Sequence, residues 1–119
     1  MKRIMLVDDV KISNFIMKKM IQKLSVDYQI FDYTYPSQAL DDLYQINPDL
    51  IFLDINMPEV NGWQFLEFMK ENNLKWPVYI LTSSTSDFDL QRSQSYNNVR
   101  DLLVKPLNAS ALKSILDKE

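Results

Sequence analysis

The stretch Leu-Ile-Phe-Leu-Asp at residues 50–54 decides the fold, because a run of large apolar side chains ends abruptly in the carboxylate of Asp54. A short apolar run without polar alternation is typical of a strand that is buried on both faces of a sheet. The same pattern recurs at residues 4–7 before Asp8, at residues 78–81 before Thr82 and at residues 102–104 before Lys105. We therefore predict a buried strand at each of these segments.

A further strand is predicted from Tyr28 to Tyr33, and Asp32 marks it as an edge strand. Helical spacing of apolar residues predicts helices at residues 11–24, from Pro36 to about Asn47, after Gly62, at 84–98 and after the capping residue Asn108. The apolar stripe of the first helix is Ile12, Phe15, Ile16, Met20 and Leu24. The helix at 84–98 has few large apolar residues, so we expect it to be weakly anchored.

Strands that alternate with helices indicate βαβ units with right-handed crossovers, and hence a parallel sheet that is covered on both faces. A chain of 119 residues suits one domain, which we assign to residues 1–119. We adopt the strand order 2-1-3-4-5 from known flavodoxin-like folds, because the sequence does not dictate it. The predicted fold class is α/β, a five-stranded parallel sheet in a flavodoxin-like three-layer sandwich.

Four of the predicted strands end in polar groups, which are Asp8 and Asp9, Asp54, Thr82 and Lys105. In this strand order they share one crevice beyond the carboxyl ends of the strands. Two carboxylates about 4 Å apart repel by about 4 kcal/mol at an effective dielectric near 20, so the crevice needs a cation. Mg²⁺ fits best because it keeps several waters and needs only one or two carboxylates. With Lys105 as a second positive charge, Asp54 is suited to accept a phosphoryl group by in-line attack.

This ordered set of residues resembles the receiver domain of bacterial two-component response regulators, and the resemblance covers the whole chain. The matching features are the acidic pair, the central Asp54, the hydroxyl of Thr82 and the dipeptide Lys105-Pro106. The resemblance implies that Asp54 is phosphorylated from a phosphohistidine on a partner histidine kinase or histidine phosphotransfer protein. That step needs no histidine on this chain.

The resemblance also implies a role for each site residue. Asp9 and Asp54 would ligate Mg²⁺, Asp8 would assist through water, and the backbone carbonyl of Asn56 would complete the protein ligands. Thr82 would hydrogen-bond the phosphoryl group and Lys105 would pair with it. The peptide bond between Lys105 and Pro106 would be cis, an uncommon isomer even before proline.

Three features depart from the family pattern. Leu102 stands where the family usually has Tyr or Phe, so the aromatic part of the usual switch is missing. Ser83 stands where the family often has Ala, which adds a hydroxyl near the phosphoryl site. The Ser-rich segment 84–98 is predicted to be the most mobile helix, and signalling then relies on a shift in its population.

Composition excludes several classes of function. The chain has no His and no Cys, which excludes an imidazole base, a thiolate nucleophile and a His- or Cys-ligated zinc site. Its single glycine cannot supply a Gly-rich nucleotide loop. The net charge of −3 argues against nucleic acid as a partner. No apolar run approaches the ~20 residues that span a bilayer, so we expect no membrane association and a cytoplasmic protein.

The leading hypothesis is a stand-alone receiver rather than a turnover enzyme, since no residues follow the last helix to form an output domain. Its output would be a contact with a downstream protein target or onward transfer of phosphate. The basic first helix, with Lys11, Lys18, Lys19 and Lys23, would steer an acidic partner helix towards the crevice. A homodimer stays open.

Two alternatives also stay open. One is a receiver-like interaction module that does not use phosphate, which the replacement at Leu102 permits. The other is a phosphatase with an aspartate nucleophile. That family shows a D-x-D pattern, whereas Asp54-Ile55-Asn56 lacks the second acid.

Overall fold

The computed structural model describes residues 2–57, 60–83 and 86–119. It contains one parallel sheet with the order β2-β1-β3-β4-β5, which confirms the predicted topology. The strands are β1 (Lys2–Val7), β2 (Tyr28–Tyr33), β3 (Leu50–Asp54), β4 (Val78–Thr82) and β5 (Val99–Val104). The edge position predicted for β2 is confirmed as well.

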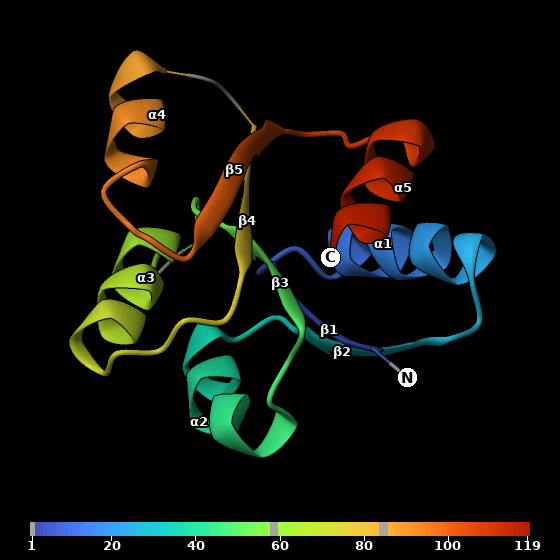
Figure 1. Ribbon diagram of the computed structural model, residues 1–119, viewed down its shortest axis with the longest axis horizontal. Helices are drawn as coiled ribbons and strands as arrows, with labels where there is room; N and C mark the ends of the chain where they lie inside the picture. The colour runs from blue at the N-terminus through green and yellow to red at the C-terminus, as the bar shows by residue number, and fades with distance from the viewer. Residues whose placement is uncertain (1, 58–59, 84–85) are drawn as a thin grey trace.

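Helices cover both faces of the sheet and give three layers (Figure 1). They are α1 (Lys11–Leu24), α2 (Pro36–Ile46), α3 (Gly62–Glu71), α4 (Asp87–Ser93) and α5 (Ala109–Lys118). Helices α1 and α5 lie together on one face, whereas α2, α3 and α4 lie on the other (Figure 1). Within the described residues, no helix combines the length and apolar character needed to cross a membrane.

The sheet register brings the ends of the strands to one edge. Val7 of β1 lies opposite Leu53 of β3, so the residues that follow each strand emerge side by side. On the other side of β3, Asp54 lies opposite Leu81. Strands β3 and β4 are buried throughout, as expected for central strands that are covered on both faces. The polar residues at their ends are therefore held by strands that are buried on both faces.

Capping residues set where two of the helices near the site begin. The side chain of Asn61 accepts a hydrogen bond from the Gln64 backbone, and the Gln64 side chain accepts one from the Asn61 N–H, which forms a capping box on α3. Asn108 caps α5 by accepting from the N–H of Ala111, as predicted.

The apolar stripe predicted for α1 faces the core only in part, because Met20 and Leu24 pack against it and the other three residues do not. Ile12, Phe15 and Ile16 are each more than half exposed. The buried residues are instead Asn14, Met17 and Ile21. The prediction was wrong for the three exposed residues because it left out the apolar Met17 and Ile21, which share the inward stripe with the polar Asn14.

The region before the last strand also differs from the prediction. Helix α4 covers only Asp87–Ser93 of the segment expected at 84–98, and Ser84 and Thr85 lie outside the described residues. Strand β5 begins at Val99 instead of residue 102, because an edge strand tolerates the exposed polar residues at 100 and 101. Phe88 is 69% exposed, so the weak apolar anchoring expected for α4 is confirmed.

Candidate functional site

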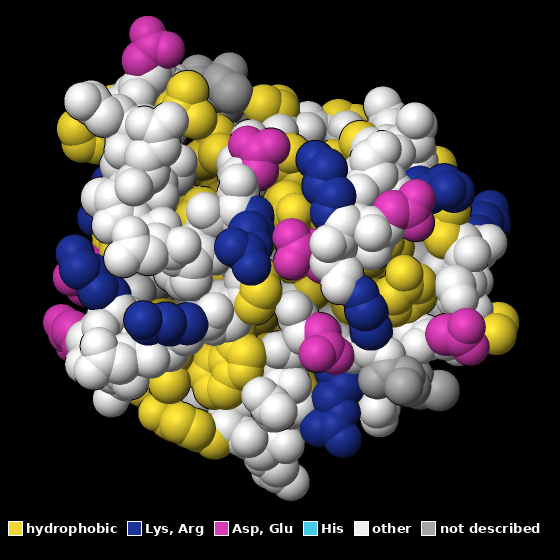
Figure 2. Space-filling view, viewed as in Figure 1, with side chains coloured by type: hydrophobic (Ala, Val, Ile, Leu, Met, Phe, Trp, Pro, Cys, Tyr) yellow, Lys and Arg dark blue, Asp and Glu magenta, His cyan; other side chains and the backbone are white. Residues whose placement is uncertain are grey.

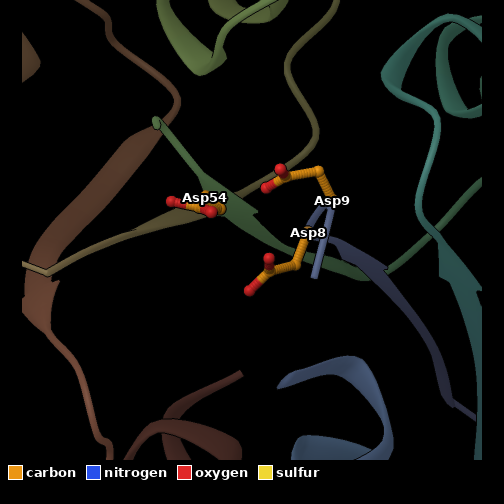
Figure 3. Close-up of side chains that lie close together, drawn as sticks. All are labelled: Asp8, Asp9 and Asp54. Atoms are coloured by element: carbon orange, nitrogen blue, oxygen red, sulfur yellow. The ribbon is translucent and has the colours of Figure 1, made fainter. Parts of the chain in front are cut away.

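Three carboxylates converge at the carboxyl edge of the sheet. Asp8 and Asp9 follow β1, and Asp54 ends β3. One oxygen of each carboxylate lies within 4.8 Å of the other two. Asp8 and Asp54 are buried and Asp9 is half-buried, and all three side chains point to the same side of the sheet edge (Figure 3). The predicted convergence of these acids is therefore present in the structure.

Lys105 joins this cluster from the end of β5. Its Nζ lies 2.6 Å from Oδ2 of Asp8 and 3.4 Å from Oδ2 of Asp54. Its backbone N–H donates to the carbonyl oxygen of Thr82 at 2.8 Å, which continues the β4–β5 pairing past the strand ends. The peptide bond from Lys105 to Pro106 is cis, as predicted. The ammonium group thus bridges two carboxylates that come from different strands.

Burial and charge act in opposite directions on this cluster. Burial raises the pKa of Asp54, and although the hydrogen bond from Asn56 and the charge of Lys105 lower it, the pKa stays above its ordinary value. Burial alone would lower the pKa of Lys105. The hydrogen bond to Asp8 and the charges of Asp8 and Asp54 outweigh burial and raise it. Lys105 therefore remains a cation. At Asp54 the favourable charge and hydrogen bond do not fully offset the cost of burying the carboxylate.

Asn56 and Thr82 complete the polar rim beside Asp54. The backbone N–H of Asn56 donates to Oδ1 of Asp54 at 3.1 Å. Its side-chain amide lies 3.5 Å from Oγ1 of Thr82, which is 1% exposed. The residue after Thr82, Ser83, is exposed. The structure thus brings Asn56 and Thr82 to the site, while the ligand role predicted for the Asn56 carbonyl stays a prediction.

Gly62 allows the chain that leaves β3 at Asp54 to come back into contact with the end of that strand. A Cβ at Gly62 would lie 2.5 Å from the Cα of Ile55 and 2.8 Å from the carbonyl oxygen of Asp54. Such distances are far below van der Waals contact, so only glycine allows α3 to start this close to the end of β3. The N–H of Gly62 also donates to the carbonyl oxygen of Ile55 at 3.2 Å.

The acidic cluster fits the divalent cation that the sequence predicts. Oδ1 of Asp9 is buried and has no hydrogen-bond partner among the residues that the structure describes. A buried carboxylate oxygen without a partner is costly, and a cation can satisfy it. Carboxylate oxygens at this separation are the ligands that Mg²⁺ prefers.

One residue near the site escaped the sequence-based prediction. Asn14 of α1 is 2% exposed, and its side-chain amide donates to the carbonyl oxygens of Asp8 and Tyr33. The available signal was the spacing of Asn14, Met17 and Ile21, which places a polar residue on the stripe that the helix buries. Leu102, noted for its departure from the family pattern, packs in the core.

Comparison with known proteins identifies one protein family along most of the chain. The family model of the response regulator receiver domain matches residues 4–117. An uncharacterized response regulatory protein of Staphylococcus epidermidis is 30% identical over 118 residues, covering 98% of this chain and 46% of that protein. The chain spans about half or less of the length of the curated relatives that it matches.

Solved structures agree with the sequence matches. The chemotaxis protein CheY4 of Vibrio cholerae superimposes with a TM-score of 0.86 at 25% identity, covering 99% of this chain and 98% of that one. A two-component response regulator of Cytophaga hutchinsonii gives a TM-score of 0.86 at 28% identity, covering 98% and 95% of the two chains. The chain belongs to the family of response regulator receiver domains.

Proposed function

We propose that Asp54 accepts a phosphoryl group from a phosphohistidine of a partner histidine kinase or phosphotransfer protein, in a reaction that requires Mg²⁺. The observation that carries this proposal is the position of Asp54, which is 4% exposed at the end of a central strand, beside Lys105 and two further carboxylates. The donor imidazole comes from the partner because this chain contains no histidine.

In the proposed step, an oxygen of Asp54 attacks the phosphorus atom in line with the bond to the donor nitrogen. The phosphorus–nitrogen bond breaks, its electron pair returns to the imidazole, and an acyl phosphate forms on Asp54. Lys105, now paired with Asp8 and Asp54, turns to the phosphoryl oxygens, and the hydroxyl of Thr82 hydrogen-bonds them. Asp9, Asp54 and the carbonyl of Asn56 would hold Mg²⁺, with Asp8 assisting through water, and the ion would supply positive charge against the phosphoryl group.

A small phosphodonor tests this function without knowledge of the partner. Incubation with phosphoramidate and Mg²⁺ should add the mass of one phosphoryl group to the protein. The gain should be lost in Asp54→Asn and when a chelator removes the metal, and it should persist in Asp41→Asn, which changes an exposed acid on α2. No mass gain in the unaltered protein favours an interaction module that does not use phosphate. Turnover of a chromogenic phosphate ester favours a phosphatase.

The outward side of α1 is the surface that we propose for the phosphodonor. Ile12, Phe15 and Ile16 are exposed there, and the ammonium of Lys19 lies 5.5 Å from the ring centroid of Phe15. Lys and Arg are interspersed with Asp and Glu over the face seen in Figure 2, so this face carries no extended patch of one charge. A partner helix that carries apolar and acidic side chains would match this surface.

Comparing two kinds of phosphodonor tests this surface. Lys19→Glu should slow phosphorylation by a phosphohistidine protein and leave the rate with phosphoramidate unchanged, because only the protein donor contacts α1. Lys75→Glu, which reverses an exposed charge outside the helices, is the matched control. Equal slowing with both donors, or slowing with neither, argues against this docking surface.

For the output we propose a shift of α4 towards contact with a downstream protein. Arg92 of α4 lies 4.6 Å from the ring centroid of Trp63, and Trp63 stacks on Tyr96 at 6.3 Å. Trp63 directly follows Gly62, so these contacts connect the loop after Asp54 to α4. Amide exchange should be faster in α4 than in the other helices and should change on phosphorylation. Protection equal to that of the other helices contradicts this output.

A further inference from the structure

Asn14 lies where β1, β2 and α1 meet, directly beside the acidic pair. Its side-chain nitrogen donates to the carbonyl oxygen of Asp8 at 3.1 Å and to that of Tyr33 at 2.9 Å. The carbonyl oxygen of Tyr33 also accepts from the N–H of Asp8 at 3.1 Å. These three hydrogen bonds form a closed circuit around the backbone of Asp8.

The circuit begins where regular strand pairing ends. Val7 and Tyr33 are the last paired residues of β1 and β2. Beyond them the Asp8 carbonyl has no strand residue opposite it, and the Asn14 amide takes that place. This carbonyl belongs to the peptide plane that joins Asp8 to Asp9, because a peptide bond is planar. Asn14 therefore fixes the orientation of the unit from which both acidic side chains extend.

Only a short side chain with two N–H donors suits this position. Both facing atoms are carbonyl oxygens, so a carboxylate would be repelled and an apolar group would leave buried acceptors without a partner. Met17 and Ile21 already supply the packing of α1 on the sheet. A buried amide adds nothing to that packing, which points to a role in holding the loop.

We infer that Asn14 is a positioning residue that orients the Asp8–Asp9 peptide so that both carboxylates face the cation. The inference rests on the proposed function, which supplies the need for that cation. Hydrogen-bond partners that orient metal ligands typically change metal affinity by about 10- to 100-fold when they are removed. Asn14 acts through the peptide backbone and does not itself touch the metal or the phosphoryl group.

The test separates cation affinity from ordinary stability. Urea unfolding is measured with chelator and with MgCl₂, in the unaltered protein, Asn14→Ala, the milder Asn14→Ser and the control Ile21→Val, which loosens the same helix face. Asn14→Ala should weaken Mg²⁺ affinity at least about tenfold, which lowers the Mg²⁺-dependent increment by about 1.4 kcal/mol when Mg²⁺ is well above both dissociation constants. Asn14→Ser keeps one donor and should lose less. Ile21→Val should be less stable but keep the full increment.

Amide exchange of metal-free protein gives a second readout. The N–H of Asp8 should lose at least about tenfold of its protection in Asn14→Ala relative to Ile21→Val, because its acceptor at Tyr33 is no longer held. If Asn14→Ala and Asn14→Ser keep the Mg²⁺ increment and this protection, the positioning role is refuted and the proposed function stands. If the unaltered protein shows no Mg²⁺ increment, the proposed function is refuted together with the role of Asn14 towards the cation.

Discussion

Replacing Asp9 with Asn should make the metal-free protein more stable, although it removes a predicted ligand. Carboxylate oxygens of Asp8, Asp9 and Asp54 lie within 4.8 Å of one another. At 4.8 Å, two unit charges repel by about 3.5 kcal/mol with an effective dielectric near 20. Asp9 faces two such neighbours. Lys105 offsets part of this repulsion through its 2.6 Å contact with Asp8.

The carboxylate of Asp9 therefore keeps a net repulsion of about one such pair from its two acidic neighbours. Because Asp9 is half-buried, solvent screening reduces this repulsion, and we expect Asp9→Asn to raise the free energy of unfolding by about 2 kcal/mol in the absence of metal. The new amide can also donate to the neighbouring carboxylates, which an aspartate cannot do. Both effects have the same sign.

Urea unfolding in chelator and in Mg²⁺ measures this change. The unaltered protein should gain stability with Mg²⁺, by about 2.7 kcal/mol when the metal is at 100 times its dissociation constant. Asp9→Asn should gain much less, so the two proteins converge or exchange order as metal is added. Asp41→Asn should behave like the unaltered protein. An Asp9→Asn variant that is less stable in chelator, or that keeps the full Mg²⁺ gain, would refute the reasoning.

Three further changes test other parts of the structure. Gly62→Ala should lower the free energy of unfolding by about 1–3 kcal/mol, measured in urea, because its Cβ collides with the backbone of Ile55. Lys105→Met should destabilise the protein in chelator by about 3 kcal/mol by leaving buried carboxylates unpaired, and Mg²⁺ should restore part of the loss. Burial and the hydrogen bond to Glu119 raise the pKa of Tyr79 from 10.0 to about 12. The neutral hydroxyl should therefore add its full contribution to the free energy of unfolding below pH 10, and this contribution should fall as pH rises towards 12. Urea unfolding of Tyr79→Phe should show a smaller fall over the same pH range.

Strands were predictable from the sequence because burial on both faces leaves an unmistakable pattern. The runs that end at Asp8 and Asp54 can be occupied only by apolar residues, since every side chain there meets a covering layer. An edge strand carries a weaker signal. In β5 the half-buried Val99 is followed by the exposed polar residues Arg100 and Asp101, so the start of this strand could not be distinguished from a loop.

The face of α1 could not be predicted because apolar content alone does not say which side meets the sheet. Ile12, Phe15 and Ile16 form a convincing stripe, yet they are exposed. The buried stripe begins with Asn14, whose burial is favourable only because two backbone carbonyl oxygens accept hydrogen bonds from its amide. That requirement comes from the pairing of β1 with β2, so it becomes visible only when the sheet is known.

The carboxyl edge of the sheet concentrates features that would be unfavourable elsewhere in a core. It holds a buried carboxylate oxygen without a partner among the described residues, a buried amide on a helix face, and a helix start that only Gly62 can occupy. All three lie around a pocket whose carboxylates leave it with excess negative charge. Binding of a cation would relieve that excess at Asp54 and would offset the further negative charge of a phosphoryl group. Because α3 starts against Ile55 and Trp63 contacts Arg92, a small shift of the loop after Asp54 would change the contacts that hold α4.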